Sequence, residues 1–94
     1  MKKYFVVRGD FGNVYSLHWA DSSDMEKLLP EGAERISRKE AERLAAAENY
    51  RRKYTPSSAG YADSAIYPAG THWDFCPEWD PRYQKIGYIW ERRK

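Results

Sequence analysis

The stretch KYFVVRGDFGNVYSLHWA, residues 3–20, decides the fold of this chain. Two runs rich in β-branched and aromatic residues, the types that favour strands, flank the sequence DFGN at residues 10–13. Asp, Gly and Asn are turn residues that tolerate a positive φ. The stretch therefore predicts a β-hairpin with strands over residues 3–9 and 14–20.

The second predicted strand alternates between two faces. Tyr15, Leu17 and Trp19 fall on one face by the two-residue period of a strand, and the residues between them fall on the other. This pattern is typical of an antiparallel sheet that is covered on one side. A similar alternation recurs near the end of the chain and predicts a third strand over residues 84–92.

A helix over residues 38–53 is the clearest single element. Ser37 is a good N-cap, and an acidic residue follows three positions later, which is the spacing of a capping box. Ala41, Leu44 and Ala45 share one helical face. Because two of these three side chains are small, the helix can approach a sheet closely.

Two further segments connect these elements. A short helix is predicted over residues 23–29, because Ser23 and Glu26 have capping-box spacing and Pro30 ends the helical pattern. Residues 55–72 are rich in Pro, Gly, Ser and Ala and have no clear period, so they predict a long ordered loop.

Together these elements predict a single small α+β domain over residues 1–94. Its expected sheet is three-stranded and antiparallel, formed by the N-terminal hairpin and the C-terminal strand, and packed against one main helix. Ninety-four residues leave no room for a second core. Aliphatic residues are few, but fifteen aromatic residues supply apolar surface, so we expect an aromatic core with some aromatic surface left over.

The chain contains a single cysteine, which cannot form an internal disulfide. This favours a reducing, cytoplasmic location. No run approaches the roughly 20 apolar residues of a membrane span, and the apolar stretch after the basic N-terminus is too short for a secretory signal. We therefore expect a soluble protein without membrane association.

Metal-ligating residue types recur at every second position of HWDFCPEWDP, residues 72–81. In an extended conformation these side chains would share one face. Structural zinc sites normally also need a second close pair of ligands, and the other histidine, His18, stands alone. Calcium loops need a glycine at the turn, where this segment has a proline. We therefore expect no metal and no other cofactor.

Cys76 is a candidate nucleophile, with His18 or His72 as its base. No local signature of a thiol enzyme surrounds Cys76, however, and a small buried thiol is the more ordinary interpretation. The sequence also lacks a Gly-rich phosphate loop, a serine elbow and a paired-cysteine motif. We therefore expect no catalytic residues and no enzymatic activity.

The same segment is a candidate protein-binding surface. Trp, Tyr and Arg carry most of the binding energy at interfaces, and ten of the fifteen aromatic residues lie at or after Tyr50. The acidic border around two tryptophans fits anchors within a polar rim. The alternative is that both indoles cap the open end of the sheet. The predicted partner-binding residues are Trp73, Asp74, Phe75, Glu78, Trp79 and Asp80.

A second, basic surface is predicted on the main helix. Residues 35–53 carry seven basic and three acidic residues. With neighbouring tyrosines as stacking platforms, such a surface can bind nucleic acid. The interleaved glutamates and a net charge of only +2 make a solvated helix face the commoner interpretation. The patch comprises Arg43, Arg51, Arg52 and Lys53.

The sequence HWDFCPEWD, residues 72–80, resembles a segment of small accessory proteins encoded by bacteriophages and prophages. The rest of the chain, rich in Trp and Tyr and poor in motifs, also resembles such viral proteins. Many of them bind and block a host factor, as anti-CRISPR and other anti-defence proteins do. The resemblance implies a non-enzymatic inhibitor in the bacterial host cytoplasm, with no catalytic residues to carry over.

The expected function is therefore that of a binding protein that blocks or modulates a host protein or a protein–nucleic acid complex. The alternative is a small nucleic-acid-binding protein that uses residues 35–53. An unpaired strand edge and a surplus of aromatic side chains are also compatible with a homodimer.

Overall fold

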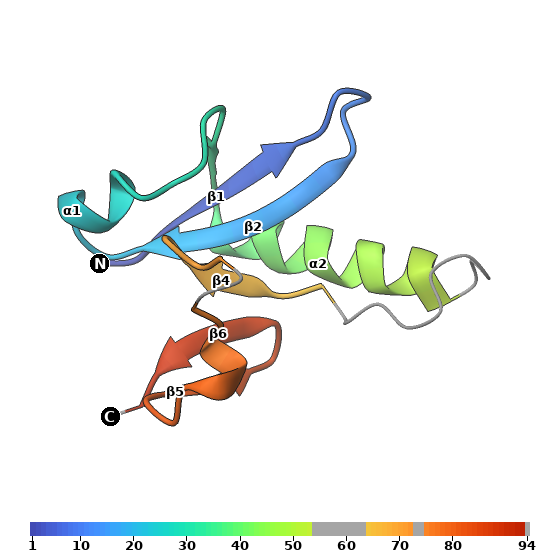
Figure 1. The fold of residues 1–94 in the computed structure, drawn as a ribbon. Helices are drawn as coiled ribbons and strands as arrows, with labels where there is room; N and C mark the ends of the chain where they lie inside the picture. The colour runs from blue at the N-terminus through green and yellow to red at the C-terminus, as the bar shows by residue number, and fades with distance from the viewer. Residues whose placement is uncertain (54–63, 73–74, 94) are drawn as a thin grey trace.

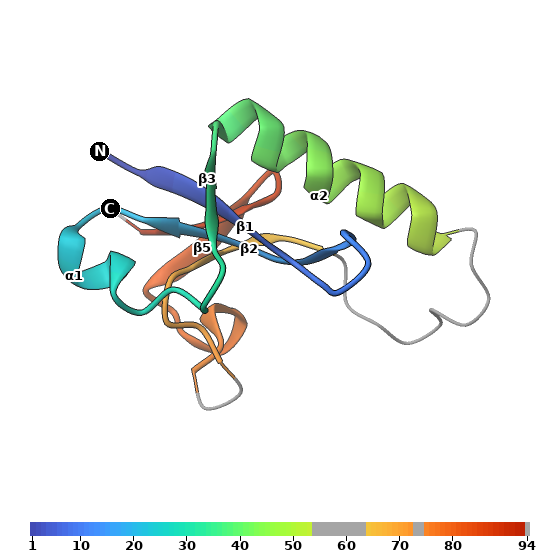
Figure 2. The same ribbon diagram turned by 90° about the horizontal axis from the view of Figure 1, so that it is seen from above.

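The computed structural model describes residues 1–53, 64–72 and 75–93, and for Arg52 and Lys53 it describes the backbone alone. The strands are β1 (Lys3–Arg8), β2 (Val14–Ala20), β3 (Glu34–Ile36), β4 (Ile66–Pro68), β5 (Tyr83–Ile86) and β6 (Ile89–Arg92). The helices are α1 (Ser23–Glu26), α2 (Arg38–Lys53) and the 3-10 helix η2 (Pro77–Trp79). The strands form one sheet in the order β3-β1-β2-β4-β6-β5, with α2 on one face (Figures 1 and 2).

The predicted three-stranded antiparallel sheet is wrong, because the sheet has six strands and mixed directions. β1 is antiparallel to both of its neighbours, β2 and β3. β4 runs parallel to β2 on one side and to β6 on the other. The class α+β remains, but the sheet is twice as wide as the alternation of residues indicates.

Strand β4 lies within the predicted loop over residues 55–72. With three residues it is too short to show an alternating pattern, and it owes its place to its neighbours. Ile66 is paired with Leu17 of β2 and with Ile89 of β6, and it is fully buried. The rest of that loop prediction, residues 55–63, lies outside the described residues.

The single strand predicted over residues 84–92 is two strands. β5 and β6 form an antiparallel hairpin that turns between Ile86 and Ile89. Gly87 has φ +63°, a left-handed conformation that glycine adopts without a steric penalty. The sequence prediction treats Gly87 as a residue within one strand and therefore misses this turn.

The N-terminal hairpin and the main helix are confirmed. β1 ends one residue earlier than predicted, and β2 has the predicted bounds. α2 spans the predicted residues, and Ser37 Oγ accepts a hydrogen bond from the Glu40 amide at 3.1 Å. α1 is shorter than predicted, and its N-cap is Ser22 rather than Ser23. In the described part of the chain, no helix has both the length and the apolar character needed to cross a bilayer.

The main core lies between α2 and one face of the sheet. The predicted helix face packs there as expected, with Ala41 and Ala45 fully buried. Tyr15 departs from its predicted face, since it is 75% exposed. The buried residues of this cluster are Tyr4, Val6, Leu17, Trp19, Ala41, Leu44, Ala45, Ile66 and Ile89. A smaller cluster on the other face joins Phe5, Ala20 and Ala69 to the segment around α1.

Trp19 is the largest of the fully buried side chains, with 0% exposure. Its Nε1–H donates a hydrogen bond to the Trp90 carbonyl at 2.6 Å. The Lys2 ammonium lies 4.7 Å from the centroid of the indole, and the Arg92 guanidinium lies 5.2 Å from it. These cation–π contacts join both ends of the described chain to the centre of the sheet.

His18 is a buried polar residue on β2. Its Nε2 lies 2.9 Å from Ser16 Oγ. Burial lowers the pKa of the His18 imidazole, and the Pro68 carbonyl acts in the opposite direction. The native fold therefore favours the neutral form of this ring.

The free energy of unfolding is expected to fall as the pH drops below about 6.5, the ordinary pKa of histidine. Because the pKa of His18 is lowered in the native state, the unfolded chain binds a proton where the native ring stays neutral. The loss is at most about 1.4 kcal/mol per pH unit for one such group. Urea melts between about pH 7.5 and 5.5 measure this dependence.

One variant isolates the contribution of His18. The pH dependence is expected to become shallower in His18→Gln than in the unaltered protein. An equally steep dependence in His18→Gln and in the unaltered protein would contradict the assignment.

Candidate protein-binding site

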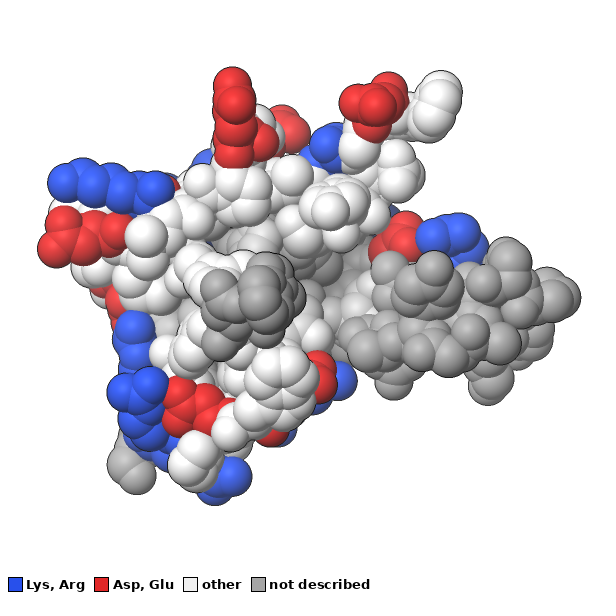
Figure 3. Space-filling view, viewed as in Figure 1, with Lys and Arg blue, Asp and Glu red and all other residues white. Residues whose placement is uncertain are grey.

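The predicted partner-binding segment runs from β4 to β5, on the side of the sheet away from α2 (Figure 2). The backbones of His72 and Phe75 pair in an antiparallel bridge. Pro77 then begins η2, a position that its fixed φ suits, and it is buried. Trp73 and Asp74 lie outside the described residues, so their role remains a prediction. Over this face of the molecule, charged side chains gather mainly at the margin (Figure 3).

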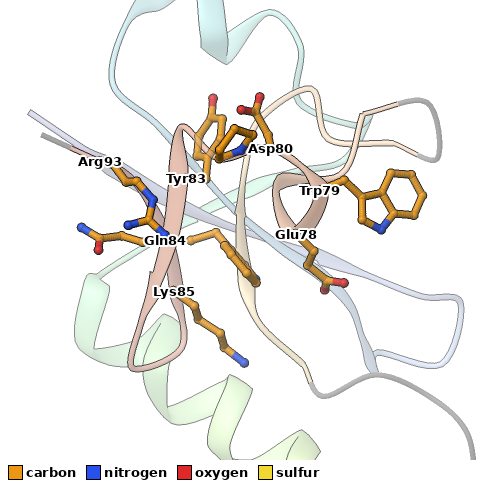
Figure 4. A pocket seen from close by; sticks show the side chains of 9 residues that line it. Glu78, Trp79, Asp80, Tyr83, Gln84, Lys85 and Arg93 are labelled. Carbon is orange, nitrogen blue, oxygen red and sulfur yellow. The ribbon is translucent and has the colours of Figure 1, made fainter.

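Trp79 is 74% exposed, which is unusual for the largest side chain in proteins. Figure 4 shows its indole pointing outward from η2, away from the β5–β6 hairpin. Phe75 is only partly exposed, and its ring packs edge-on against Tyr83, with centroids 5.8 Å apart and an interplanar angle of 71°. Of the two described aromatic residues in the predicted set, Trp79 is therefore the one presented to solvent.

The two described acidic residues of the predicted set already have partners within the chain. Asp80 accepts hydrogen bonds from the Arg82 guanidinium, the shortest at 2.7 Å, and from the Arg82 backbone amide at 2.9 Å. These hydrogen bonds lower the pKa of the Asp80 carboxyl. Glu78 accepts a hydrogen bond from the Tyr67 hydroxyl at 3.1 Å. The acidic border predicted around Trp79 is thus in part engaged internally.

A cavity of about 590 Å³ lies between η2 and the β5–β6 hairpin (Figure 4). Its aromatic lining comes from Trp79, Tyr83 and Trp90, and Lys85 and Arg93 contribute positive charge. Glu78, Asp80 and Gln84 complete its polar lining, and its volume is in the usual range of ligand-binding sites.

Charges of both signs line this cavity, since Glu78 and Asp80 belong to its lining together with Lys85 and Arg93. Neither Lys85 nor Arg93 forms an ion pair in the described part of the chain, whereas Arg82 is paired with Asp80. A second cavity of about 230 Å³ adjoins the first and is lined by Arg82, Arg92 and Arg93, together with a tyrosine. Because Arg93 lines both cavities, its guanidinium is available to an anionic group in either one.

The sequence alone did not place the β5–β6 hairpin at this site. The sequence pattern predicts one strand here, and the glycine at position 87 is the signal that indicates a turn between two strands. The residues that this interpretation missed are Tyr83, Gln84, Lys85, Trp90 and Arg93.

Both residues of the predicted basic patch whose side chains are described, Arg43 and Arg51, form ion pairs on α2. Arg43 donates to Glu40 at 2.9 Å through Nε, and this interaction lowers the pKa of the Glu40 carboxyl. Arg51 donates to Glu48 at 2.9 Å. The side chains of Arg52 and Lys53 lie outside the described part. Three ion pairs on α2 join its three glutamates to Arg38, Arg43 and Arg51, so the excess positive charge of the helix lies on Lys39, Arg52 and Lys53.

The candidates for catalysis and metal binding are not assembled into a site in the described residues. His18 is buried on β2, and Cys76 is partly exposed before η2. Among the described residues, no group of three or more His, Cys, Asp and Glu side chains is arranged to hold a metal ion.

Comparisons with protein family models, with curated proteins and with solved structures find no match for this chain. The assignment of function therefore depends on the residues of the chain itself.

Proposed function

We propose that this chain is a non-enzymatic binding domain that attaches to a protein partner through Trp79 and the cavity beside it. The observation that carries the proposal is the exposure of the Trp79 indole, 74%, at the rim of a cavity lined by further aromatic rings. Tryptophan is among the residues most enriched at binding hot spots, and such residues sit beside pockets from which a partner can exclude water.

The partner in this proposal is a host protein or a protein–nucleic acid complex in the bacterial cytoplasm. The resemblance of residues 72–80 to phage-encoded accessory proteins supports this choice. In the proposed mode of action, the domain occupies a functional surface of its partner and so inhibits it, as anti-CRISPR and other anti-defence proteins do. No chemical step is needed for such inhibition.

Trp79→Ala is expected to weaken capture of the partner by about thirtyfold or more, the effect of losing a hot-spot residue. The measurement uses the immobilised protein and bacterial lysate, with bound proteins quantified by mass spectrometry and the enriched partner then titrated in purified form. Circular dichroism is expected to remain native, because the Trp79 side chain packs little against the core.

Tyr15→Ala is the matched control. Tyr15 is as exposed as Trp79, at 75%, but it lies on β2 and does not line the cavity. It is expected to leave capture unchanged. Equal capture by the Trp79→Ala and Tyr15→Ala variants would overturn the proposal.

A further inference from the structure

Strand β5 forms one edge of the sheet, with β6 as its neighbour in the sheet order. An edge strand presents backbone N–H and C=O groups to which another strand can bind. The cavity beside η2 reaches this edge, because both Gln84 and Lys85 line it and neighbouring residues of a strand point to opposite faces. Figure 4 shows these two side chains leaving β5 in opposite directions.

The hairpin register identifies the backbone groups that face outward. The amide of Arg93 donates to the carbonyl of Arg82 at 2.7 Å, so residues 82 and 93 form a hydrogen-bonded pair. Such pairs alternate along an antiparallel ladder. Gln84 and Ile86 therefore bond to β6, and the backbone groups of Tyr83 and Lys85 point away from it. The Tyr83 amide already donates to the Asp80 carbonyl at 3.1 Å. The outward amide of Lys85 is left for a binding partner.

A second copy of this chain fits the edge poorly. The outward-facing residues of β5 are Tyr83 and Lys85, and in a symmetric antiparallel pair they must lie opposite each other, which leaves three registers. One register places Lys85 opposite Lys85 of the other copy, where like charges repel. The other two place Tyr83 opposite Lys85 or opposite Tyr83, and both require the Tyr83 amide, which already donates to Asp80. These constraints favour a partner of a different sequence.

The charges at the edge select the chemistry of that partner. Four charged residues line the cavity, and its two carboxylates already have partners: Asp80 is paired with Arg82, and Glu78 accepts a hydrogen bond from the Tyr67 hydroxyl. Lys85 and Arg93 have no carboxylate partner in the described part of the chain. Carboxylate side chains of a bound segment would complement both cations. Tyr83 and Trp90 also line the cavity and suit an apolar side chain placed between those carboxylates.

We propose that β5 binds an extended acidic segment of the partner as an added strand. The Lys85 amide and carbonyl bond to its backbone, an apolar side chain enters the cavity, and flanking carboxylates pair with Lys85 and Arg93. This inference rests on the proposed function, since it names the chemistry that the same binding surface recognises.

The test is a selection of random displayed decapeptides on the full chain, followed by titration of the enriched peptides by fluorescence anisotropy. The expected sequences carry Asp or Glu around an apolar residue. In the double variant Lys85→Glu and Arg93→Glu, the selection is expected to enrich Lys and Arg instead. Enrichment of basic or uncharged sequences by the unaltered protein, or of no sequence, overturns the proposal.

Two substitutions at one position separate the backbone contact from the charge. Lys85→Gln removes only the charge and is expected to weaken binding of an enriched peptide about threefold to tenfold. Lys85→Pro also removes the outward amide, which the hairpin does not use, and is expected to weaken binding at least about tenfold further. Equal affinities of the two variants would show that no strand is added.

If Lys85→Pro does not fold, amide exchange in the unaltered protein tests strand addition instead. In the unaltered protein, exchange of the Lys85 amide is expected to slow on addition of an enriched peptide, and unchanged exchange at saturation contradicts strand addition. If Lys85→Pro still captures the partner from lysate and Trp79→Ala does not, strand addition is rejected and the proposed function is retained.

Discussion

Trp19→Ala is expected to lower the free energy of unfolding by about 3–5 kcal/mol, the range for truncating a buried tryptophan. The indole is fully enclosed between α2 and the sheet, and its Nε1–H bonds to the Trp90 carbonyl. Truncation leaves a cavity in the centre of the core and removes the surface on which Lys2 and Arg92 rest. Since a small domain has only about 5–15 kcal/mol of stability, partial unfolding at room temperature is an expected outcome.

Chemical denaturation monitored by circular dichroism measures this loss. Trp79→Ala makes the same substitution at an exposed site and is expected to change the stability by less than about 0.5 kcal/mol. Trp19→Phe keeps an aromatic ring but leaves the Trp90 carbonyl without its donor, so an intermediate loss of about 1–3 kcal/mol is expected. Similar losses for Trp19→Ala and Trp79→Ala would contradict the placement of Trp19 at the centre of the core.

Ile66→Ala is expected to destabilise the protein by about 2–5 kcal/mol. Ile66 is fully buried, and it pairs with Leu17 on one side and Ile89 on the other. Loss of its side chain removes apolar contacts on both sides of β4, so the β5–β6 hairpin is expected to separate from the rest of the sheet first. Urea melts give the total loss, and amide exchange along residues 83–92 reports the separation.

Ile86→Ala is the matched control for Ile66→Ala. Ile86 is 49% exposed at the end of β5, and its truncation is expected to cost about 1 kcal/mol or less. If the two substitutions cost the same, β4 does not join the two parts of the sheet.

The parts of the fold that are predictable from the sequence are those formed by local interactions. The hairpin over residues 3–20 has a turn sequence between two alternating strands, and α2 has the Ser37 cap and a face of small residues. Each of these signals acts within a few residues of the chain. For that reason these elements can be predicted without knowledge of the tertiary structure.

The parts of the fold that the sequence does not predict depend on long-range contacts. Three residues of β4 become a strand because Leu17 and Ile89 lie beside Ile66, and nothing within residues 64–72 indicates those neighbours. For the same reason, the sequence predicts only part of the candidate site. The aromatic excess pointed to Trp79, but the cations beside it belong to a hairpin that the sequence pattern presents as one strand.

The hydrogen bond between Trp19 and Trp90 has a consequence for synthesis on the ribosome. Seventy-one residues separate the two partners, and at about 5–20 residues per second the second follows the first by roughly 4–14 s. The hairpin and α2 form within milliseconds or less once they emerge. The edge of β2 is covered by β4, and Ile66 follows its partner Leu17 by 49 residues, so for roughly 2–10 s the nascent chain carries β2 as an unpaired edge beside an unfinished core. This is the state in which small sheets aggregate and in which chaperones bind them.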